Sequence, residues 1–183
     1  MGAMPWQIAG PYHPDPASAL RAVQAERFKQ NYDLKKLLEE HIANVQDSVR
    51  YTETDDEYGL LETYRENLTQ LDEIKCQPLP TDIHEQVKLL RQIEAIGSGE
   101  IGNILDIESV SKSREPRKVV PLSSQELQDL FGTIHPSREH VTAERLDKIY
   151  NTIDRGEAVC FPIFERPPSQ QPIGWFFVGY TVD

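Results

Sequence analysis

The chain has 183 residues, of which 38% are hydrophobic and 27% are charged, values typical of a globular protein in water. Its formal net charge of −11 at pH 7 opposes binding to a phosphate backbone, because affinity for nucleic acid comes largely from Lys and Arg. The same charge favours a partner protein with a basic surface. Two cysteines are too few for a disulfide framework, and no apolar run approaches membrane-spanning length. We therefore expect a reduced, cytoplasmic protein without a membrane segment.

The N-terminal part predicts an extended segment followed by a helix. Residues 4–14 are rich in proline, glycine and aromatic side chains, which favours an extended segment with Trp6 docked on the fold. Asp15 followed by Pro16 is a typical helix start, since an acidic N-cap accepts backbone N–H groups and proline fits the first helical position. We expect this helix to run to about Gln30.

Residues 33–75 predict two amphipathic helices joined as an antiparallel hairpin. Asp33 is placed to cap the first helix, and apolar residues then recur with the 3.6-residue helical period. The run Thr54–Glu57 matches a capping box and predicts that the second helix begins there. Twelve acidic and five basic residues give this hairpin most of the net negative charge. The candidate interaction surface predicted on it consists of Asp55, Asp56, Glu57, Glu62 and Glu66.

The sequence after the hairpin predicts one more helix and then a change to strands. Asp82 and Glu85 can cap a fourth helix, which Gly97 would end. The hydrophobic period then changes, so that residues 102–110 and the short run 118–120 predict strands.

Two helices and two strands complete the prediction. Ser123 or Ser124 is placed to cap a helix that ends at Phe131, and Ser137 is placed to cap a helix over residues 137–154. Residues 158–164 and 173–182 predict two strands, joined by a proline-rich connection.

These elements predict an α+β fold with a small antiparallel sheet, packed helices and an inserted antiparallel helical hairpin. We expect residues 4–32 and 76–183 to form a compact domain. Residues 33–75 would be the acidic hairpin inserted into it.

Residues 97–102, Gly-Ser-Gly-Glu-Ile-Gly, match the dinucleotide-binding fingerprint letter for letter. That fingerprint requires a strand before it and a helix after it, because the helix N-terminus holds the pyrophosphate. Here a helix is predicted before it and a strand after it, and Glu100 would face the phosphates. We therefore interpret the motif as a helix end and a connector, and we expect no bound cofactor.

One alternative function is a winged-helix nucleic-acid-binding protein. Two helices followed by two strands have the order of that motif, and residues 137–154 would be its recognition helix. This helix carries basic residues but also four acidic residues, which would repel phosphates. The charge pattern therefore disfavours nucleic acid as the partner.

A second alternative is a metal-dependent or hydrolytic enzyme that uses the polar cluster His135, His140 and Glu144. His140 and Glu144 are four residues apart and can share a helix face. Metal binding needs three or four converging ligands, however, and no metal-ligand motif such as HExxH or CxxC is present,. We therefore expect no metal and no catalytic residue. Cys160 lies in an apolar run, which predicts a buried, inert thiol.

Several short runs of residues resemble a family of small bacterial proteins. They are Met4-Pro5-Trp6 and Gly10-Pro11-Tyr12 near the start, Phe131-Gly132-Thr133 with Pro136-Ser137-Arg138-Glu139, and the ending from Trp175 to Gly179-Tyr180. The family is uncharacterised, so the resemblance implies no activity and no catalytic residue. It implies only a compact α+β unit with an inserted hairpin.

The leading functional hypothesis is a cytoplasmic protein-binding or regulatory module of an inhibitor, immunity or assembly type, rather than an enzyme. It rests on the large charged helical surface and on the lack of a recognisable catalytic constellation in the sequence. We expect the partner to be another protein with a basic surface. The sequence does not indicate an oligomeric state.

Overall fold

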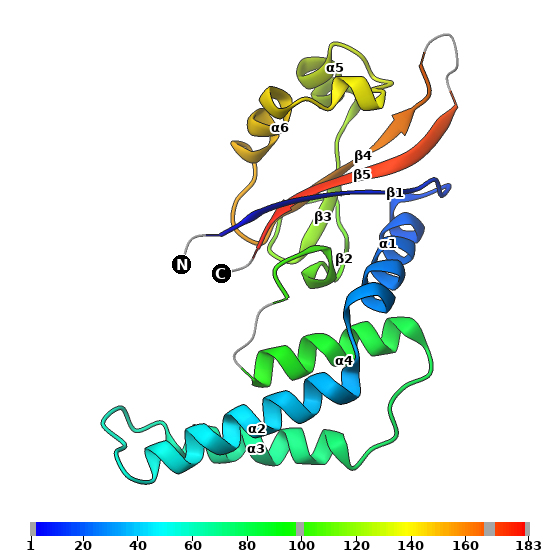
Figure 1. Cartoon of the computed structure of the whole chain (residues 1–183). Coiled ribbons are helices and arrows are strands. Elements are labelled where there is room, and N and C mark those ends of the chain that lie inside the picture. The colour runs from blue at the N-terminus through cyan, green and yellow to red at the C-terminus, as the bar shows by residue number, and fades with distance from the viewer. Residues whose placement is uncertain (1–2, 98–100, 167–170, 182–183) are drawn as a thin grey trace. The chain divides into compact units, whose positions relative to one another are not determined.

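The computed structural model divides the chain into two compact units, which are described one at a time below (Figure 1). The predicted α+β class is confirmed, with six α-helices and a five-stranded sheet in the part of the chain that the structure describes. That part comprises residues 3–97, 101–166 and 171–181. The first unit contains residues 1–27 and 102–183, and the second contains residues 28–101.

The first unit is built on a sheet with the strand order β1-β5-β4-β3-β2. The strands are β1 (Pro5–Pro11), β2 (Ser109–Val110), β3 (Lys118–Pro121), β4 (Ala158–Phe164) and β5 (Pro172–Tyr180). Strand β5 is antiparallel to β1 and β4, whereas β3 is parallel to β2 and β4. Two helices lie between β3 and β4 in the chain, and a helical connection of this kind allows parallel pairing. The sheet is therefore mixed, and not antiparallel throughout as the sequence suggested.

Helices cover both faces of this sheet (Figure 1). Helix α1 (Pro16–Asn31) and the short 3₁₀ helix η1 (Ile104–Asp106) pack on one face, and α5 (Ser124–Phe131) and α6 (Ala143–Tyr150) pack on the other. Side chains alternate between the faces along each strand. On β4, Cys160 lies in the core under α1, and its neighbour Phe161 lies in the core under α5 and α6. A central two-faced strand is therefore apolar at nearly every position.

The strand predicted over residues 102–110 is wrong for most of its length. The Asn103 side chain accepts a hydrogen bond from Leu105 N–H and so caps η1. The buried Gln24 side chain of α1 donates to the carbonyl oxygens of Ile104 and Ile107, at 3.0 and 2.6 Å. Only Ser109–Val110 pairs as a strand. These polar bonds to a helix replace the sheet ladder that an apolar run of this kind would otherwise join.

The single helix predicted over residues 137–154 is also wrong. The chain forms one 3₁₀ turn, η2 (Arg138–His140), and then begins α6 after Thr142. The His140 ring turns back and bonds Ser137, whose hydroxyl lies 2.8 Å from Nδ1. Thr142 then accepts from Arg145 N–H as a new N-cap. Two local caps therefore divide the apolar run into two short pieces.

The second unit consists of the helices α2 (Leu34–Thr52), α3 (Leu61–Lys75) and α4 (Ile83–Ile96), together with the end of α1. Helices α2 and α3 pack on each other as a hairpin, and α4 packs against both. The predicted N-caps Asp33 and Asp82 are confirmed, because each carboxylate accepts two backbone N–H groups. Buried apolar residues on all three helices form the interior, among them Leu38, Ile42, Leu71, Ile74, Leu90 and Ile93.

The capping box predicted at Thr54–Glu57 is wrong, because α3 begins only at Leu61. Asp56 accepts hydrogen bonds from the backbone N–H groups of Leu60, at 2.7 Å, and Leu61, at 3.3 Å. Residues 53–60 therefore form a loop at the tip of the hairpin. Tyr58, which falls within the helix predicted to begin at Thr54–Glu57, lies in this loop and is 79% exposed.

Most of the net negative charge belongs to the second unit. Residues 28–101 contain 8 Lys and Arg against 16 Asp and Glu, which is a formal charge of −8. The acidic character that the sequence assigned to the hairpin thus extends over the unit that contains the hairpin and α4.

A histidine on α2 is paired with a glutamate on α4 inside the second unit. His41 Nε2 lies 3.2 Å from Glu94 Oε2, and both side chains are 12% exposed. The His41 ring also lies against Gly97, where a Cβ would stand 2.0 Å from Nδ1 and 2.8 Å from Cγ. Gly97 is the C-cap of α4 and has a φ of −77°, so glycine is needed there for space and not for backbone conformation.

We expect Gly97→Ala to destabilise the second unit by about 1–3 kcal/mol, because the added methyl group must displace a whole ring that Glu94 holds. Urea unfolding followed by circular dichroism would measure the change. In a His41→Ala background the ring is gone, and the same substitution should cost almost nothing. An equal cost in both backgrounds would show that the His41 contact is not what requires glycine at this position.

Candidate interaction surface

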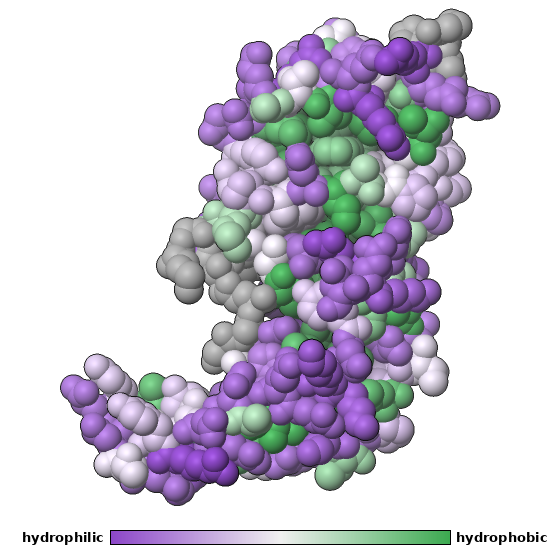
Figure 2. Space-filling view, viewed as in Figure 1, coloured by the Kyte–Doolittle hydropathy of each residue, from purple (hydrophilic) through white to green (hydrophobic). Residues whose placement is uncertain are grey.

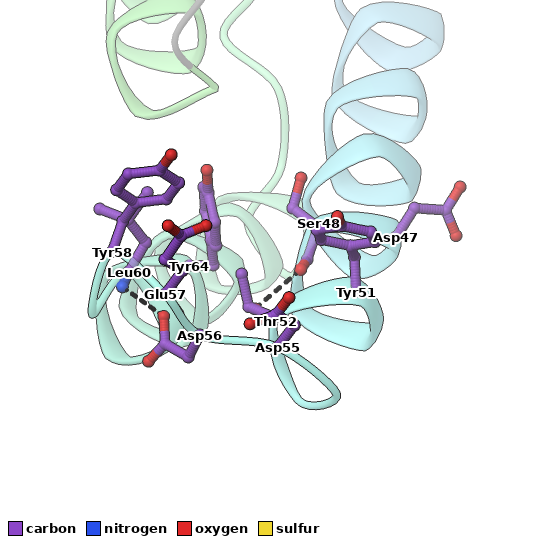
Figure 3. A pocket seen from close by; sticks show the side chains of 10 residues that line it. All are labelled: Asp47, Ser48, Tyr51, Thr52, Asp55, Asp56, Glu57, Tyr58, Leu60 and Tyr64. Carbon is purple, nitrogen blue, oxygen red and sulfur yellow. Dashed lines mark hydrogen bonds between the residues drawn. The ribbon is translucent and has the colours of Figure 1, made fainter.

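A hollow of about 490 Å³ opens at the tip of the α2–α3 hairpin, and we call it the tip hollow (Figure 3). Figure 3 shows side chains from the end of α2 on one side of it, and side chains from the tip loop and α3 on the other. Its lining combines two kinds of residue. They are the tyrosines Tyr51, Tyr58 and Tyr64 and the acidic residues Asp47, Asp55, Asp56 and Glu57.

Local hydrogen bonds give the tip loop a defined shape. The end of α2 is closed by Asp55 N–H, which donates to the carbonyl of Tyr51. Gly59 has a φ of +66°, a left-handed conformation that glycine adopts without steric cost. The Asp56 carboxylate then caps α3. Asp56 therefore has a structural role in addition to its charge.

One ion pair ties the loop to the side of the hairpin. Arg65 on α3 lies 3.0 Å from the Glu53 carboxylate at the end of α2. Both side chains are half exposed, so the pair contributes little to stability by itself. The pair does engage Arg65, which is the basic residue of α3 closest in sequence to the tip loop.

Two of the three tyrosines of the tip hollow are more exposed than large side chains usually are. Tyr51 is 72% exposed and Tyr58 is 79% exposed, and the neighbouring Leu60 is 39% exposed. Single exposed apolar residues are ordinary, whereas several of them around one hollow are typical of interaction sites. Tyrosine combines a large apolar body with a polar tip and is favoured at protein interfaces.

The carboxylates at the tip are not neutralised by nearby bases. No ion pair joins Asp55, Asp56 or Glu57 to a basic residue within the described parts of the chain. Asp47 is the exception, with Arg50 at 3.1 Å in an exposed pair. Several carboxylates of one sign around a hollow attract a cation and raise its local concentration.

Of the five residues predicted as an interaction surface, three line the tip hollow. They are Asp55, Asp56 and Glu57. The other two, Glu62 and Glu66, are exposed on α3 outside its lining. The tyrosines were missed because Tyr58 and Tyr64 both fall within the helix predicted to begin at Thr54–Glu57, where aromatic residues are expected to be buried. A signal was present, since three tyrosines occur within the 14 residues from Tyr51 to Tyr64.

The tip hollow is chemically suited to cationic side chains. Carboxylates bind ammonium and guanidinium groups through charge-assisted hydrogen bonds, and the face of a tyrosine ring attracts a cation by up to about 1–2 kcal/mol. A hollow with both features favours Lys and Arg over neutral residues.

The predicted polar cluster His135, His140 and Glu144 is not brought together around one point. His135 packs on the ring of Phe164, with 4.5 Å between ring centroids, while the His140 ring bonds Ser137. Glu144 is exposed and pairs with Lys148 at 2.9 Å, and this hydrogen bond lowers the pKa of the Glu144 carboxyl. Within the described residues, no group of three or more His, Cys, Asp or Glu side chains is placed to hold a metal ion.

Helix α6 forms within residues 137–154, the predicted recognition helix, and has only eight residues. Leu146 and Ile149 are buried in the core under α5 and α6. Its exposed positions include Glu144, Asp147 and Lys148, so the solvent face is mixed in charge. The proline-rich connection between the two C-terminal strands, which would form the wing in that alternative, includes residues 167–170, and these lie outside the described residues.

Two other sequence motifs have ordinary structural roles. Gly97 ends α4 as predicted, and the rest of the glycine-rich motif up to residue 100 lies outside the described residues. Cys160 is fully buried, and burial raises the pKa of its thiol to about 12. This thiol therefore stays protonated and inert at neutral pH, as the sequence predicted.

Comparison with known proteins adds no relative. No family model matches the chain, and neither a curated protein nor a solved structure matches it significantly. Of the helices that the structure describes, none has the length and apolar character needed to cross a bilayer.

Proposed function

We propose that this protein is a binding or regulatory module, of an inhibitor, immunity or assembly type, and that the tip hollow receives Lys or Arg side chains of a partner protein. The observation that supports this proposal is the pair of exposed tyrosines, Tyr51 and Tyr58, beside unneutralised carboxylates at the end of a hairpin. The charge of −8 on the second unit would steer a basic partner toward it,.

The arrangement suggests a division of roles within the surface. Asp55 and Glu57 supply charge, whereas Tyr51 and Tyr58 supply apolar surface that a bound partner would cover. Buried aromatic residues dominate the affinity of most interfaces, while exposed charges mainly set the association rate and its dependence on salt.

The double variant Asp55→Asn/Glu57→Gln tests the role of charge, because neither carboxylate makes a hydrogen bond or ion pair that supports the loop among the described contacts. Asp56 is left intact because it caps α3. We expect partner proteins captured by the wild-type chain to associate more slowly with the variant, by roughly threefold to tenfold at low salt. The difference should shrink as ionic strength rises, because the Debye length falls below about 8 Å.

The matched control is Glu39→Gln/Glu73→Gln, which removes the same two charges from exposed positions nearer the other end of the hairpin. It should leave the association rate close to that of the wild type. A second variant, Tyr51→Ala/Tyr58→Ala, should accelerate dissociation. The proposal is rejected if both double charge variants slow association equally, or if the tyrosine variant binds as tightly as the wild type.

A further inference from the structure

A second hollow, of about 350 Å³, lies in the first unit beside the edge strand β1, and we call it the sheet-edge hollow. Residues Gln7 and Ala9 of β1 line it, together with apolar side chains from the sheet and from the η2–α6 segment. The apolar lining includes Val141, Leu146, Ile163 and Phe176. In the first unit, Figure 2 shows apolar side chains gathered where α6 and the sheet meet, with hydrophilic residues around them.

A single cationic side chain stands at this apolar hollow. Arg138 lines it and is exposed, and its guanidinium makes no ion pair or hydrogen bond with any residue of the described chain. The two neighbouring arginines differ in this respect. Arg145 donates to the carbonyl of His140, and Arg166 is paired with Glu139.

We propose that the sheet-edge hollow binds a small amphipathic carboxylate, with its aliphatic chain on the apolar lining and its carboxylate on Arg138. Small-molecule sites are concave, mostly apolar and have volumes of roughly 300–1,000 Å³, with a few polar groups that fix the ligand's orientation. A guanidinium matches a carboxylate with two parallel hydrogen bonds. The side-chain amide of Gln7 supplies a further donor in the same lining.

The backbone of β1 argues for a small molecule and against an added peptide strand. Thr181 N–H donates to the carbonyl of Met4, and backbone groups alternate between the two sides of an antiparallel strand. The odd-numbered residues of β1 therefore present their backbone groups outward. Two of them, Pro5 and Pro11, have no N–H. Only Gln7 and Ala9 could donate to another strand, which is too short a ladder for strand addition.

The proposal is tested by titrating the whole purified chain with sodium decanoate in an isothermal calorimeter. We expect saturable binding of one decanoate per chain. Arg138→Gln should weaken it by about tenfold or more, which is the effect of losing a hydrogen bond to a charged group. Decylammonium, with the same chain and the opposite charge, should not bind at this site.

A second variant tests the apolar part of the site without touching the core. Ala9 is exposed on the edge strand, and Ala9→Phe would fill the hollow with a side chain that strands favour. It should abolish decanoate binding while the melting temperature stays unchanged. The matched control Arg21→Gln, an exposed arginine on α1, should bind decanoate as the wild type does.

Three outcomes would overturn the proposal. They are no saturable heat with decanoate, equal binding of decanoate and decylammonium, and unchanged binding by the folded Arg138→Gln and Ala9→Phe variants. The site lies in the first unit and the tip hollow in the second. Failure of one proposal therefore leaves the other untouched.

Discussion

Replacing Phe161 with alanine should lower the free energy of unfolding of the first unit by about 3–5 kcal/mol, because the truncation removes buried apolar surface and leaves a cavity. Phe161 is fully buried on β4. The centroid of its ring lies 4.9 Å from that of Phe131 and 5.6 Å from that of Phe176. The substitution therefore removes the centre of an aromatic cluster that joins α5 to the sheet.

Urea unfolding followed by tryptophan fluorescence would measure this loss in the first unit alone. Both tryptophans of the chain, Trp6 and Trp175, belong to that unit. The control Phe161→Leu keeps most of the volume and should cost roughly 1–2 kcal/mol. If alanine cost no more than leucine, the cluster would not be a core, and the assignment of β4 as the central strand would be wrong.

The second large effect is expected for Leu71→Asp, which should destabilise the second unit by about 3–5 kcal/mol, since a buried carboxyl group without a partner is strongly unfavourable. Leu71 lies on α3 and is fully buried. Far-ultraviolet circular dichroism is the suitable probe, because α2, α3 and α4 contain more helical residues than the helices of the first unit.

The matched control for this experiment is the adjacent residue. Gln70 is exposed on the same helix, so Gln70→Asp introduces the same charge without burial and should change stability by at most about 0.5 kcal/mol. Similar losses for the two variants would mean that charge, and not burial, limits the stability of the hairpin. No loss for Leu71→Asp would contradict the packing of α3.

Local features of the sequence predicted most of the helices and strands. Asp33 and Asp82 were recognised as N-caps and act as such, and of the two candidate serines Ser123 is the cap, because capping depends on the side chain and on backbone N–H groups two or three residues away,. The two C-terminal strands were recognised from short apolar runs between turn residues. The burial of Cys160 follows from its apolar surroundings in the sequence.

Local sequence patterns gave wrong helix boundaries where two possible N-caps lie close together. Thr54–Glu57 matches a capping box, but Asp56 caps a helix that begins at Leu61. A capping box specifies a favourable bond and does not specify which of several nearby acids makes it. The same competition at Ser137 and Thr142 divided one predicted helix into two pieces.

By itself, the sequence determined the helical hairpin, its acidic charge and the α+β class, because these depend on period, composition and residues close in the chain. Only the tertiary structure decided the strand order and the parallel pairing of β3 with β4, since pairing between distant segments leaves no local pattern. It also decided which side chains meet. The tyrosines around the tip hollow and Arg138 beside the sheet-edge hollow depend on loop geometry and on burial from all sides, and neither can be inferred from residue spacing.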